Sequence, residues 1–248
     1  MLGNSENRIK REKEFHDQRF TNDQREVLAP IYTFANYSKS FFENIVTNIK
    51  PEDNVLEIGC GINSISKKII DKGANVTIID ISEKAIEIAK REFLRYELNA
   101  SFFVMDAENL KFNEKTFDLI YGIGILHHLS IENFITEIKK VLKKGGKAVF
   151  YEPLGHNLFI NIFRNITPNL RSKDEHPLLI KDLEMIKSNF SKTKLYYFHF
   201  FSLLTIPLVY FPLLIKLIYL INVIDNTLLK VFPLLNKYCW ISIVEIKS

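Results

Sequence analysis

The sequence predicts an α/β fold, in which a mostly parallel sheet carries helices on both faces. Apolar runs typical of strands alternate with amphipathic segments typical of helices over residues 51–153. The run Val55–Ile58 ends in the glycine turn Gly59-Cys60-Gly61. A second apolar run, Asn75–Ile79, ends in Asp80, about twenty residues further along the chain. With 248 residues and a hydrophobic fraction of 47%, the chain can bury a real core in one such domain.

The composition argues against several classes of function. The net charge of +4, from 33 basic and 29 acidic residues, does not indicate a nucleic-acid partner, and no basic run interleaved with aromatics occurs. Cys60 and Cys239 give neither a disulfide framework nor metal-ligand spacing. We therefore expect no metal and a reducing, cytoplasmic location. The charged N-terminus does not read as a signal peptide.

The glycine turn is the part of the sequence with the clearest chemistry. Gly59 and Gly61 can adopt positive φ and have no side chain to exclude a ligand. A helix is expected from Ser64 to Asp71, with Gly73 at its end. Strand, turn and helix N-terminus together predict a nucleotide-type site, where Asp80 can accept hydrogen bonds from ribose hydroxyls. The alternative is that Asp80 only begins the next turn or caps the following helix.

Glu57-x-Gly59-x-Gly61 followed by Asp80 resembles the S-adenosylmethionine-binding core of class I methyltransferases. Ser64 replaces the last glycine of the dinucleotide fingerprint, and Asn63 stands where a third glycine is frequent in the family. The resemblance covers residues 10–153 and implies a Rossmann-like, seven-stranded sheet with S-adenosylmethionine as cofactor. The residues that it implies in cofactor binding are Glu57, Gly59, Cys60, Gly61, Asp80, Ile81, Asp106, Ala107 and Gly122.

The elements after Asp80 follow the same alternation. Ser82 is expected to cap a helix that runs to about Tyr96. The strand Ser101–Met105 leads to Asp106, which the resemblance places at the adenine amino group; an ordinary turn residue is the alternative. The remaining elements are a strand at Phe117–Tyr121, in which Asp118 is taken as structural, a helix at Ile131–Leu142 followed by a solvated lysine cluster, and a strand at Lys147–Tyr151.

Candidate catalytic groups follow the fourth and fifth strands. In the resembled family the segment Gly122–Leu129, with its Leu-His-His-Leu form, lies near the methionine part of the cofactor. We expect a general base among His127, His128, Glu152 and His16, although both histidines of the pair could be structural.

The first 50 residues are predicted to form a helical cap outside the sheet. Helices are expected in Glu12–Arg25 and Ile31–Ile49, before Pro51. Such segments often cover the active site in the resembled family. The candidate contacts are Phe15, His16, Asp17, Tyr32 and Tyr37. The alternative is that the aromatic residues pack in the core and His16 is exposed.

Residues 156–248 break the alternating pattern and are expected on the acceptor side, after a cofactor-binding core at 51–155. Helices are predicted at His156–Ile166 and Leu179–Phe190, and the loop between them contains the acceptor-side candidates Glu175 and His176. The segments Lys194–Phe201 and Trp240–Ile246 read as a strand pair. In the resembled family the last strand is antiparallel and lies between the fifth and sixth.

An apolar helical insertion, about 203–235, separates these two strands. The run from Phe200 to Ile215 has no charge, and its length approaches that of a membrane span. Pro207, Pro212 and Lys216 argue against a span. Three interpretations remain open: a buried lid, a peripheral membrane contact that would place the protein at the inner face of a membrane, and true insertion.

The function predicted is methyl transfer from S-adenosylmethionine to an O, N or C nucleophile of a small acceptor. The apolar insertion suggests that this acceptor is lipid-like or lipid-linked. The first alternative is an NAD(P)-dependent oxidoreductase, which would share the glycine turn and the distal acid. The second is a non-catalytic, membrane-associated scaffold with the same fold.

Overall fold

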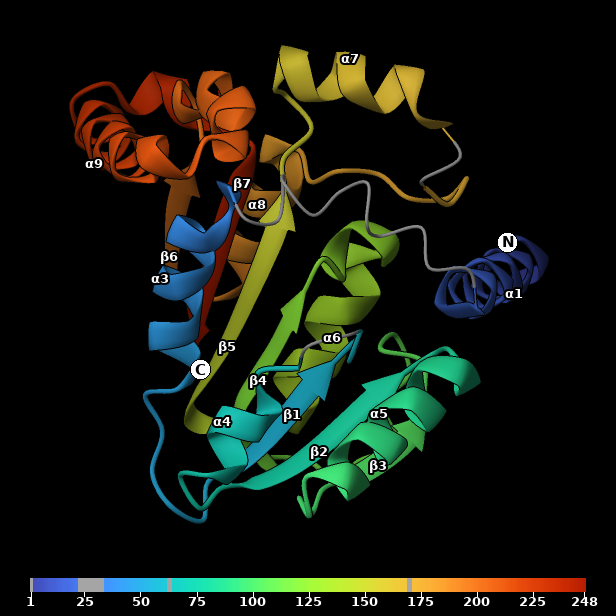
Figure 1. Cartoon of the computed structure of the whole chain (residues 1–248). Coiled ribbons are helices and arrows are strands. Elements are labelled where there is room, and N and C mark those ends of the chain that lie inside the picture. The colour runs from blue at the N-terminus through green and yellow to red at the C-terminus, as the bar shows by residue number, and fades with distance from the viewer. Residues whose placement is uncertain (1, 22–33, 62–63, 169–170) are drawn as a thin grey trace.

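A seven-stranded sheet lies at the centre of the molecule (Figure 1). The strands of this computed structural model are β1 (Asn54–Ile58), β2 (Asn75–Asp80), β3 (Ser101–Val104), β4 (Phe117–Ile123), β5 (Leu142–Pro153), β6 (Lys192–Phe198) and β7 (Ile241–Lys247). Their order is β3-β2-β1-β4-β5-β7-β6, and only β7 is antiparallel to its neighbours. The structure describes residues 2–21, 34–61, 64–168 and 171–248. The Rossmann-like, seven-stranded fold expected from the sequence is confirmed.

Helices cover both faces of the sheet, because successive side chains of a buried strand point in opposite directions. Leu119 and Tyr121 of β4 belong to the core on one face, together with Phe42 and Phe93 from the helices there. Ile120 belongs to the core on the other face, together with Phe134. The first face carries α3 (Asn36–Val46), α4 (Ser66–Ile70) and α5 (Glu83–Arg95), and the second carries α6 (Ile131–Val141) and α8 (Ile180–Asn189).

Local sequence signals account for most helix ends. Ser82 caps α5 by accepting a hydrogen bond from the Ala85 backbone N–H at 3.1 Å, as predicted. Gly73 adopts a φ of +84° just beyond α4, where a helix commonly ends in the left-handed region. These interactions fix where the helices begin and end relative to the strands, and hence which residues reach the edge of the sheet.

The start of β5 differs from the prediction. This strand begins at Leu142 and not at Lys147, and it pairs with β4 through a shift in register. The predicted solvated lysine cluster is only partly solvated, because Lys143 donates to Asp118 at 2.6 Å. Asp118 also accepts from the Asn54 N–H at 2.9 Å, so its expected structural role is confirmed. This long-range carboxylate–lysine pair stabilises the early strand in a way that a local pattern does not reveal.

The end of β6 also differs from the prediction. This strand stops at Phe198, and Phe201 is exposed and not part of the sheet. His199 adopts a φ of +65°, a left-handed conformation that turns the chain out of the strand. The three predicted residues beyond Phe198 therefore belong to the connection that leads into the insertion.

The N-terminal segment contains α1 (Leu2–Thr21), which lies apart from the sheet near the carboxyl ends of β1 and β2 (Figure 1). The predicted helices are found within the described residues, α1 ending at Thr21 and α3 beginning at Asn36. The end of the predicted helix Glu12–Arg25, the start of Ile31–Ile49 and the candidate Tyr32 lie outside the described residues.

The second half of the chain adds helical structure at one end of the sheet. After β5 come α7 (Leu158–Ile166) and a loop, and the insertion lies between β6 and β7 as predicted. It comprises η4 (Ser202–Tyr210), η5 (Pro212–Leu214), α9 (Ile215–Val231) and η6 (Pro233–Tyr238). Among the described residues, no helix combines the length and the apolar character that a bilayer crossing requires.

Candidate functional site

A pocket lies where the carboxyl ends of β1, β2 and β3 meet α1. It contains about 600 Å³ of empty space including its open mouth. Five of the predicted cofactor residues line it, namely Gly59, Asp80, Ile81, Asp106 and Ala107, and so do two predicted catalytic residues, His16 and His128. The structure therefore brings together residues from five separate segments that lie far apart in the sequence.

The glycine turn forms one wall of the pocket. Gly59 has a φ of +76°, and a Cβ atom there would lie 2.0 Å from Ile125 Cδ1. Gly61 also has a positive φ, of +46°, but a Cβ atom there would meet no neighbour within 4 Å. Gly59 is therefore required by both conformation and space, whereas Gly61 is required by conformation alone.

Glu57 lies behind this wall and holds the turn from within. One of its carboxylate oxygens accepts hydrogen bonds from Ser64 and from Ser66, the latter at 2.6 Å, and Ser66 also contacts the Tyr121 hydroxyl at 2.7 Å. Burial raises the pKa of Glu57 to about 7. Glu57 lies outside the pocket lining, and these contacts orient the glycine turn.

The position of Asp80 is compatible with both roles that the sequence left open. Its carboxylate accepts a hydrogen bond from the Ser82 N–H at 2.9 Å, which ties it to the start of α5, and it also faces the pocket. Burial raises its pKa, which marks a carboxylate with little water around it. Cys60 points at Asp80 with Sγ 3.6 Å away and lies outside the pocket lining, and its cofactor contact stays a prediction.

Asp106 occupies the equivalent position after β3. Its carboxylate accepts from the Glu108 N–H at 2.9 Å, which forms a local turn, while the residue still lines the pocket beside Ala107. Burial raises the pKa of Asp106 as it does that of Asp80. Gly122 lies beneath the lining, where a Cβ atom would approach Ile58 O to 2.9 Å. Two carboxylates and the glycine turn thus form a cradle that fits a nucleoside-type cofactor.

The histidine pair is divided between the pocket and the protein behind it. His128 lines the pocket, whereas His127 Nδ1 contacts Glu152 at 2.8 Å outside the lining. Glu152 is fully buried and also accepts from the N–H groups of Ile125 and Leu126 at 2.8 and 2.9 Å. Burial lowers the pKa of His127 to about 4 and raises that of Glu152 to about 7. Glu152 therefore fixes the turn that carries His128, and no part of it reaches the pocket.

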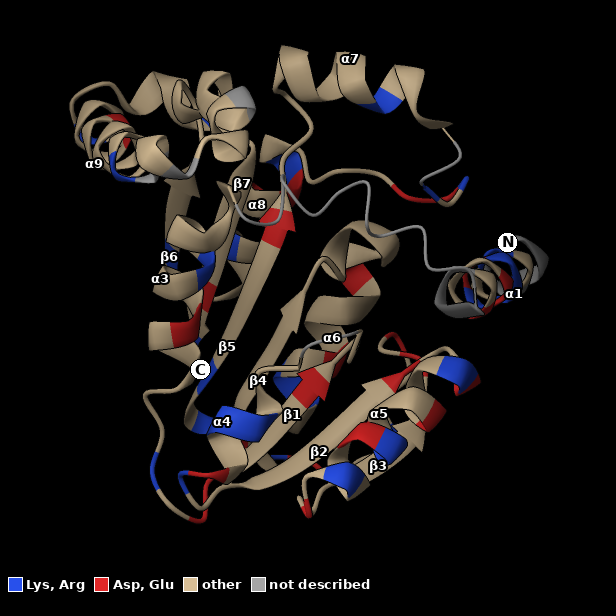
Figure 2. Cartoon of the chain, viewed as in Figure 1, with Lys and Arg blue, Asp and Glu red and all other residues tan. Residues whose placement is uncertain are grey.

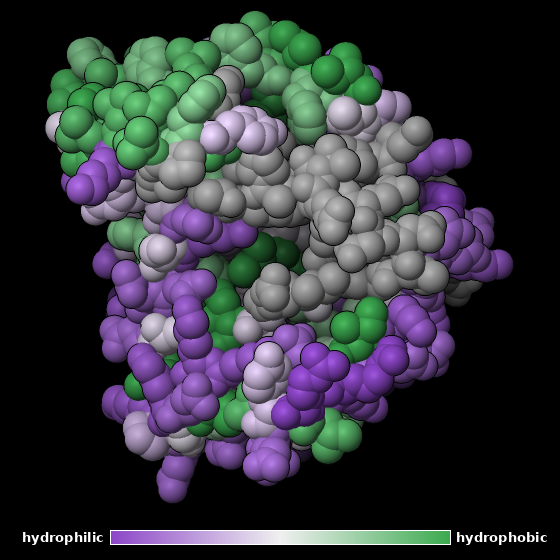
Figure 3. Space-filling model, in the orientation of Figure 1, coloured by the Kyte–Doolittle hydropathy of each residue, from purple (hydrophilic) through white to green (hydrophobic). Residues whose placement is uncertain are grey.

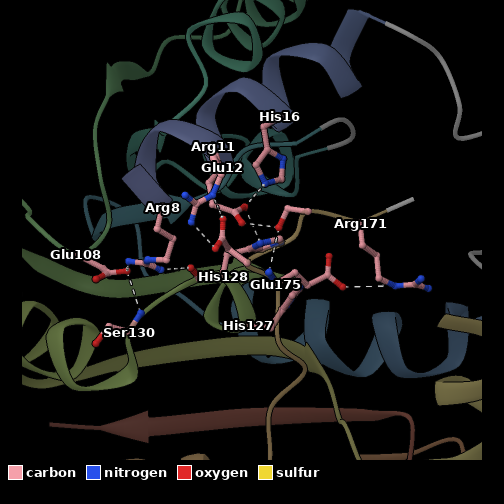
Figure 4. A network of polar contacts seen from close by, with 12 residues as sticks. Arg8, Arg11, Glu12, His16, Glu108, His127, His128, Ser130, Arg171 and Glu175 are labelled. Atoms are coloured by element: carbon pink, nitrogen blue, oxygen red, sulfur yellow. Dashed lines mark hydrogen bonds and ion pairs between the residues drawn. The ribbon is translucent and has the colours of Figure 1, made fainter. Parts of the chain in front are cut away.

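Helix α1 closes the pocket with residues that the sequence analysis did not select (Figure 4). Glu12 Oε2 lies 3.0 Å from His128 Nδ1 and 3.5 Å from His16 Nε2, and its other oxygen accepts from Ser172. Burial alone would raise the pKa of Glu12, but the contacts with the two histidines and Ser172 outweigh it and lower the pKa. Burial lowers the pKa of His128, so this imidazole is neutral at neutral pH.

Arg8 is a second missed residue on the same helix. Its guanidinium donates to His128 O at 2.6 Å and pairs with Glu108, which also accepts from the Ser130 N–H. Arg8, Glu12 and His16 are spaced four residues apart, so they share one face of α1. This spacing is the signal by which the sequence could have revealed them.

The loop after α7 connects to α1 through charged pairs. Arg11 donates two hydrogen bonds of 2.7 Å to Asp174, and Glu175 pairs with Arg164 of α7. The His176 N–H donates to His127 O at 2.9 Å, which ties this loop to the histidine turn. Glu175 and His176, selected as acceptor-side candidates, therefore lie beside the catalytic candidates.

Tyr37 and Asp17, two candidates from the helical cap, lie outside the pocket lining. Tyr37 lies away from the pocket, because its hydroxyl accepts from Asn226 of the insertion at 2.9 Å. The sequence showed no metal-ligand spacing, yet Glu12, His16 and His128 bring three potential ligand atoms within 4.8 Å of one another. Asp17 accepts from Ser82, which anchors α1 to the start of α5.

Comparison with known proteins identifies the family of the central part of the chain. Residues 55–146 match the family described as a methyltransferase domain. These residues belong to the class I S-adenosylmethionine-dependent methyltransferases. S-adenosylmethionine is the cofactor of this family, as the resemblance of the glycine turn implied.

Curated relatives of this methyltransferase domain include enzymes of small-molecule metabolism. A ubiquinone biosynthesis O-methyltransferase from Pelagibacter ubique is 38% identical over 135 residues, which are 53% of this chain and 55% of the relative. The sterol 4-C-methyltransferase strm-1 from Caenorhabditis elegans is 31% identical over 124 residues, 48% of this chain and 37% of the relative. The chain thus spans about half or less of the length of these relatives.

Solved structures share the fold at low sequence identity. Phosphoethanolamine N-methyltransferase 2 from Haemonchus contortus, in complex with S-adenosylmethionine, superposes with a TM-score of 0.61 at 16% identity, over 86% of this chain and 52% of the other. Geranyl diphosphate C-methyltransferase from Streptomyces coelicolor gives a TM-score of 0.62 at 10% identity, over 90% of this chain and 84% of the other. At these identities the likeness is one of fold.

Proposed function

We propose that this chain transfers the methyl group of S-adenosylmethionine to an oxygen, nitrogen or carbon atom of a small-molecule acceptor. The observation that carries the proposal is the single pocket in which Gly59, Asp80 and Asp106 face His128. Two of the relatives are named for a sterol and for ubiquinone biosynthesis, and these names support a small-molecule acceptor. In this proposal residues 51–155 bind the cofactor, while residues 1–50 and 156–248 shape the acceptor side.

The residues present fit the cofactor. Asp80 is in position to accept hydrogen bonds from ribose hydroxyls and Asp106 from the adenine amino group, and Gly59 leaves room for the methionine end. When bound, S-adenosylmethionine supplies a methyl group activated by a positively charged sulfur. The chain must then align the acceptor with this methyl group and exclude water, which α1 does by closing over the pocket.

His128 is the general base of this proposal for a hydroxyl acceptor. It is neutral because burial lowers its pKa, and Glu12 faces its Nδ1 at 3.0 Å. The carboxylate oxygen and Nδ1 lie close together but form no hydrogen bond in the structure. In this proposal the carboxylate favours a proton on Nδ1, which leaves the lone pair on Nε2 for the base. His127 and Glu152 then position the turn, and His16 supports Glu12 from the same helix.

The identity of the cofactor and the turnover of an acceptor distinguish this proposal from the oxidoreductase and from the non-catalytic scaffold. The matched family and the relatives named above are methyltransferases, which favours S-adenosylmethionine over a nicotinamide. A scaffold that kept the fold would bind the cofactor and turn over no acceptor. A lipid-like acceptor, suggested by the apolar insertion, is the finer part of the proposal.

Calorimetric titration with S-adenosylmethionine and S-adenosylhomocysteine tests the cofactor assignment. Asp80→Asn keeps an acceptor for the Ser82 N–H but removes the charge that faces the pocket. We expect it to weaken binding about 10- to 100-fold, the value of one or two charge-assisted hydrogen bonds. Asp71→Asn, at an exposed position after α4, is the matched control and should bind like the wild type. Folded wild-type protein that binds neither compound would refute the proposal.

A further inference from the structure

Helix α7 exposes an apolar face that no other element covers. None of its described side chains is buried, and Leu158, Phe159, Ile162 and Ile166 are each more than half exposed. Their spacing places them together on one side of the helix. A water-exposed helix ordinarily turns such a stripe toward the core, so α7 shows the reverse of the usual pattern.

Helix α9 also exposes a row of apolar side chains to the surroundings. Its buried side chains include two apolar and two polar residues: Ile218, Asn222, Asp225 and Leu229. Asp225 accepts hydrogen bonds from the N–H groups of Phe200, Phe201 and Ser202 and from the Ser202 hydroxyl. The outward side is apolar and exposed, with Leu217, Leu220, Val223, Ile224 and Val231. This helix therefore leaves a row of apolar groups exposed although two of its buried positions are polar.

The two helices form one continuous surface. Ile160 of α7 packs against the cluster that contains Leu203 of η4 and Ile218 of α9. Asn157, which caps α7, also donates to Tyr238 O at 2.6 Å. Figure 3 shows hydrophobic residues gathered over this end of the molecule, above a largely hydrophilic body. We call the exposed apolar side chains of α7, of α9 and of the flanking segments at Leu204, Leu213 and Leu234 the apolar face.

The charges around the apolar face have one sign. Residues 199–240 contain a single acidic residue, the buried Asp225, whereas Lys216, Lys230 and Lys237 are exposed. Residues 154–171 contain no acidic residue. Figure 2 shows long uncharged stretches on α7 and the insertion, with blue segments among them. Exposed apolar groups with interspersed cations match the chemistry of an anionic bilayer surface, where each basic residue adds to the attraction.

The apolar face lies on the same edge of the sheet as the cofactor pocket. Helix α7 follows the carboxyl end of β5, and the insertion follows that of β6, which runs parallel to β5 (Figure 1). The Arg164–Glu175 pair connects α7 to the loop at His127. An acceptor held at a membrane under this face would therefore approach the pocket from the side of the histidines.

We propose that the apolar face docks on an anionic phospholipid bilayer, and that the methyl acceptor is an amphiphile residing in that bilayer. The second part rests on the methyl transfer proposed above. The face lies on the surface without crossing the membrane, which agrees with the lack of a sufficiently long apolar helix among the described residues. Of the three interpretations left open for residues 203–235, this is peripheral contact, now extended to α7.

Sedimentation of the full chain with vesicles tests the docking. Vesicles of phosphatidylcholine with phosphatidylglycerol are compared with pure phosphatidylcholine, at low and high salt. We expect binding to the anionic vesicles that weakens with salt and falls at least about tenfold in Leu217→Glu/Ile224→Glu and in Phe159→Glu/Ile162→Glu. Lys216→Glu should weaken it about fivefold or more. Leu94→Glu, on α5 at 79% exposure, carries the same change outside the apolar face and should bind like the wild type.

The outcomes separate docking from catalysis. Wild-type protein that stays in the supernatant, or α7 and α9 variants that sediment like the wild type, would overturn docking. A dimer in solution that Leu217→Glu/Ile224→Glu converts to monomer, without vesicle binding, would assign the face to a second copy of the chain. Calorimetry with S-adenosylmethionine on the same preparations reports the cofactor site independently. Vesicle binding without cofactor binding would refute the methyltransferase activity and leave the docking intact.

Discussion

The cofactor pocket and the apolar face lie on the same edge of one sheet, yet they distribute polar groups in opposite ways. In and behind the pocket, the buried acids and histidines have nearby partners of opposite charge or backbone donors, as Glu152 does with His127. In the insertion two buried residues of α9, Asn222 and Asp225, are polar, while many of its apolar residues are exposed. In our proposal this edge serves two environments, with a polar ligand on one side and a bilayer on the other.

The largest effect is expected where the insertion joins the sheet. Asp225→Ala removes the acceptor of four hydrogen bonds and leaves the N–H groups of residues 200–202 without it. We expect a loss of about 3–5 kcal/mol in the free energy of unfolding, measured with urea. Asn226→Ala removes a single bond, to Tyr37, and should cost about 1 kcal/mol. Equal losses would show that the inward polar side of α9 does not hold the insertion.

A smaller effect is expected in the pocket wall. Gly59→Ala combines strain at a positive φ with an overlap against Ile125, and should cost about 2–3 kcal/mol of stability together with most of the cofactor affinity. Gly61→Ala introduces only the strain of a positive φ and should cost about 1 kcal/mol of stability. The comparison is made by thermal unfolding and calorimetry. If Gly61→Ala loses as much affinity as Gly59→Ala, the close approach to Ile125 is not what shapes the wall.

The third prediction concerns His199, which is buried between α3 and the insertion. Its ring contacts the hydroxyls of Ser38 at 2.7 Å and Ser202 at 3.3 Å, and burial lowers its pKa to about 3. In the unfolded chain this imidazole takes up a proton as the pH falls through about 6.5, whereas in the folded chain burial opposes its protonation. The contribution of His199 to the free energy of unfolding is therefore complete above about pH 6.5 and is lost as the pH falls toward 3.

Glu57 and Glu152 act in the opposite direction, since their raised pKa values of about 7 favour the folded state as the pH falls from 7 toward 4.5. The His199 contribution is therefore measured as a difference from His199→Asn, a residue that tolerates the positive φ. Stability of the variant relative to the wild type should rise as the pH falls from 6.5 to 4.5. A difference that does not change with pH would contradict a buried, neutral His199.

The smallest effect is expected where α1 closes the pocket. Arg8 and Glu108 form an ion pair whose partners are 21% and 5% exposed, so solvent weakens only part of it. A double-mutant cycle with Arg8→Ala and Glu108→Gln should give a coupling of about 1 kcal/mol in unfolding. A coupling near zero would mean that α1 is held by its other contacts, such as that of Asp17 with Ser82.

The sequence by itself determined the sheet and the cofactor side of the site. Strand periodicity, the glycines at 59 and 61 and the serine cap of α5 are local signals, because backbone conformation and capping depend on residues close in the chain. Asp80, Asp106 and His128 could be selected for the same reason, since each lies at the end of a strand or a few residues after it, and the apolar run fixes that end.

Only the tertiary structure decided which groups act together. The contact of Glu12 with His128 joins residues 116 positions apart, and Ser172 reaches Glu12 across an even larger interval. Composition showed that residues 203–235 are apolar, but not which side of α9 faces outward or that α7 continues the same surface. Contacts of this kind depend on how the elements pack, because burial and charge pairing are properties of the folded chain and not of a local segment.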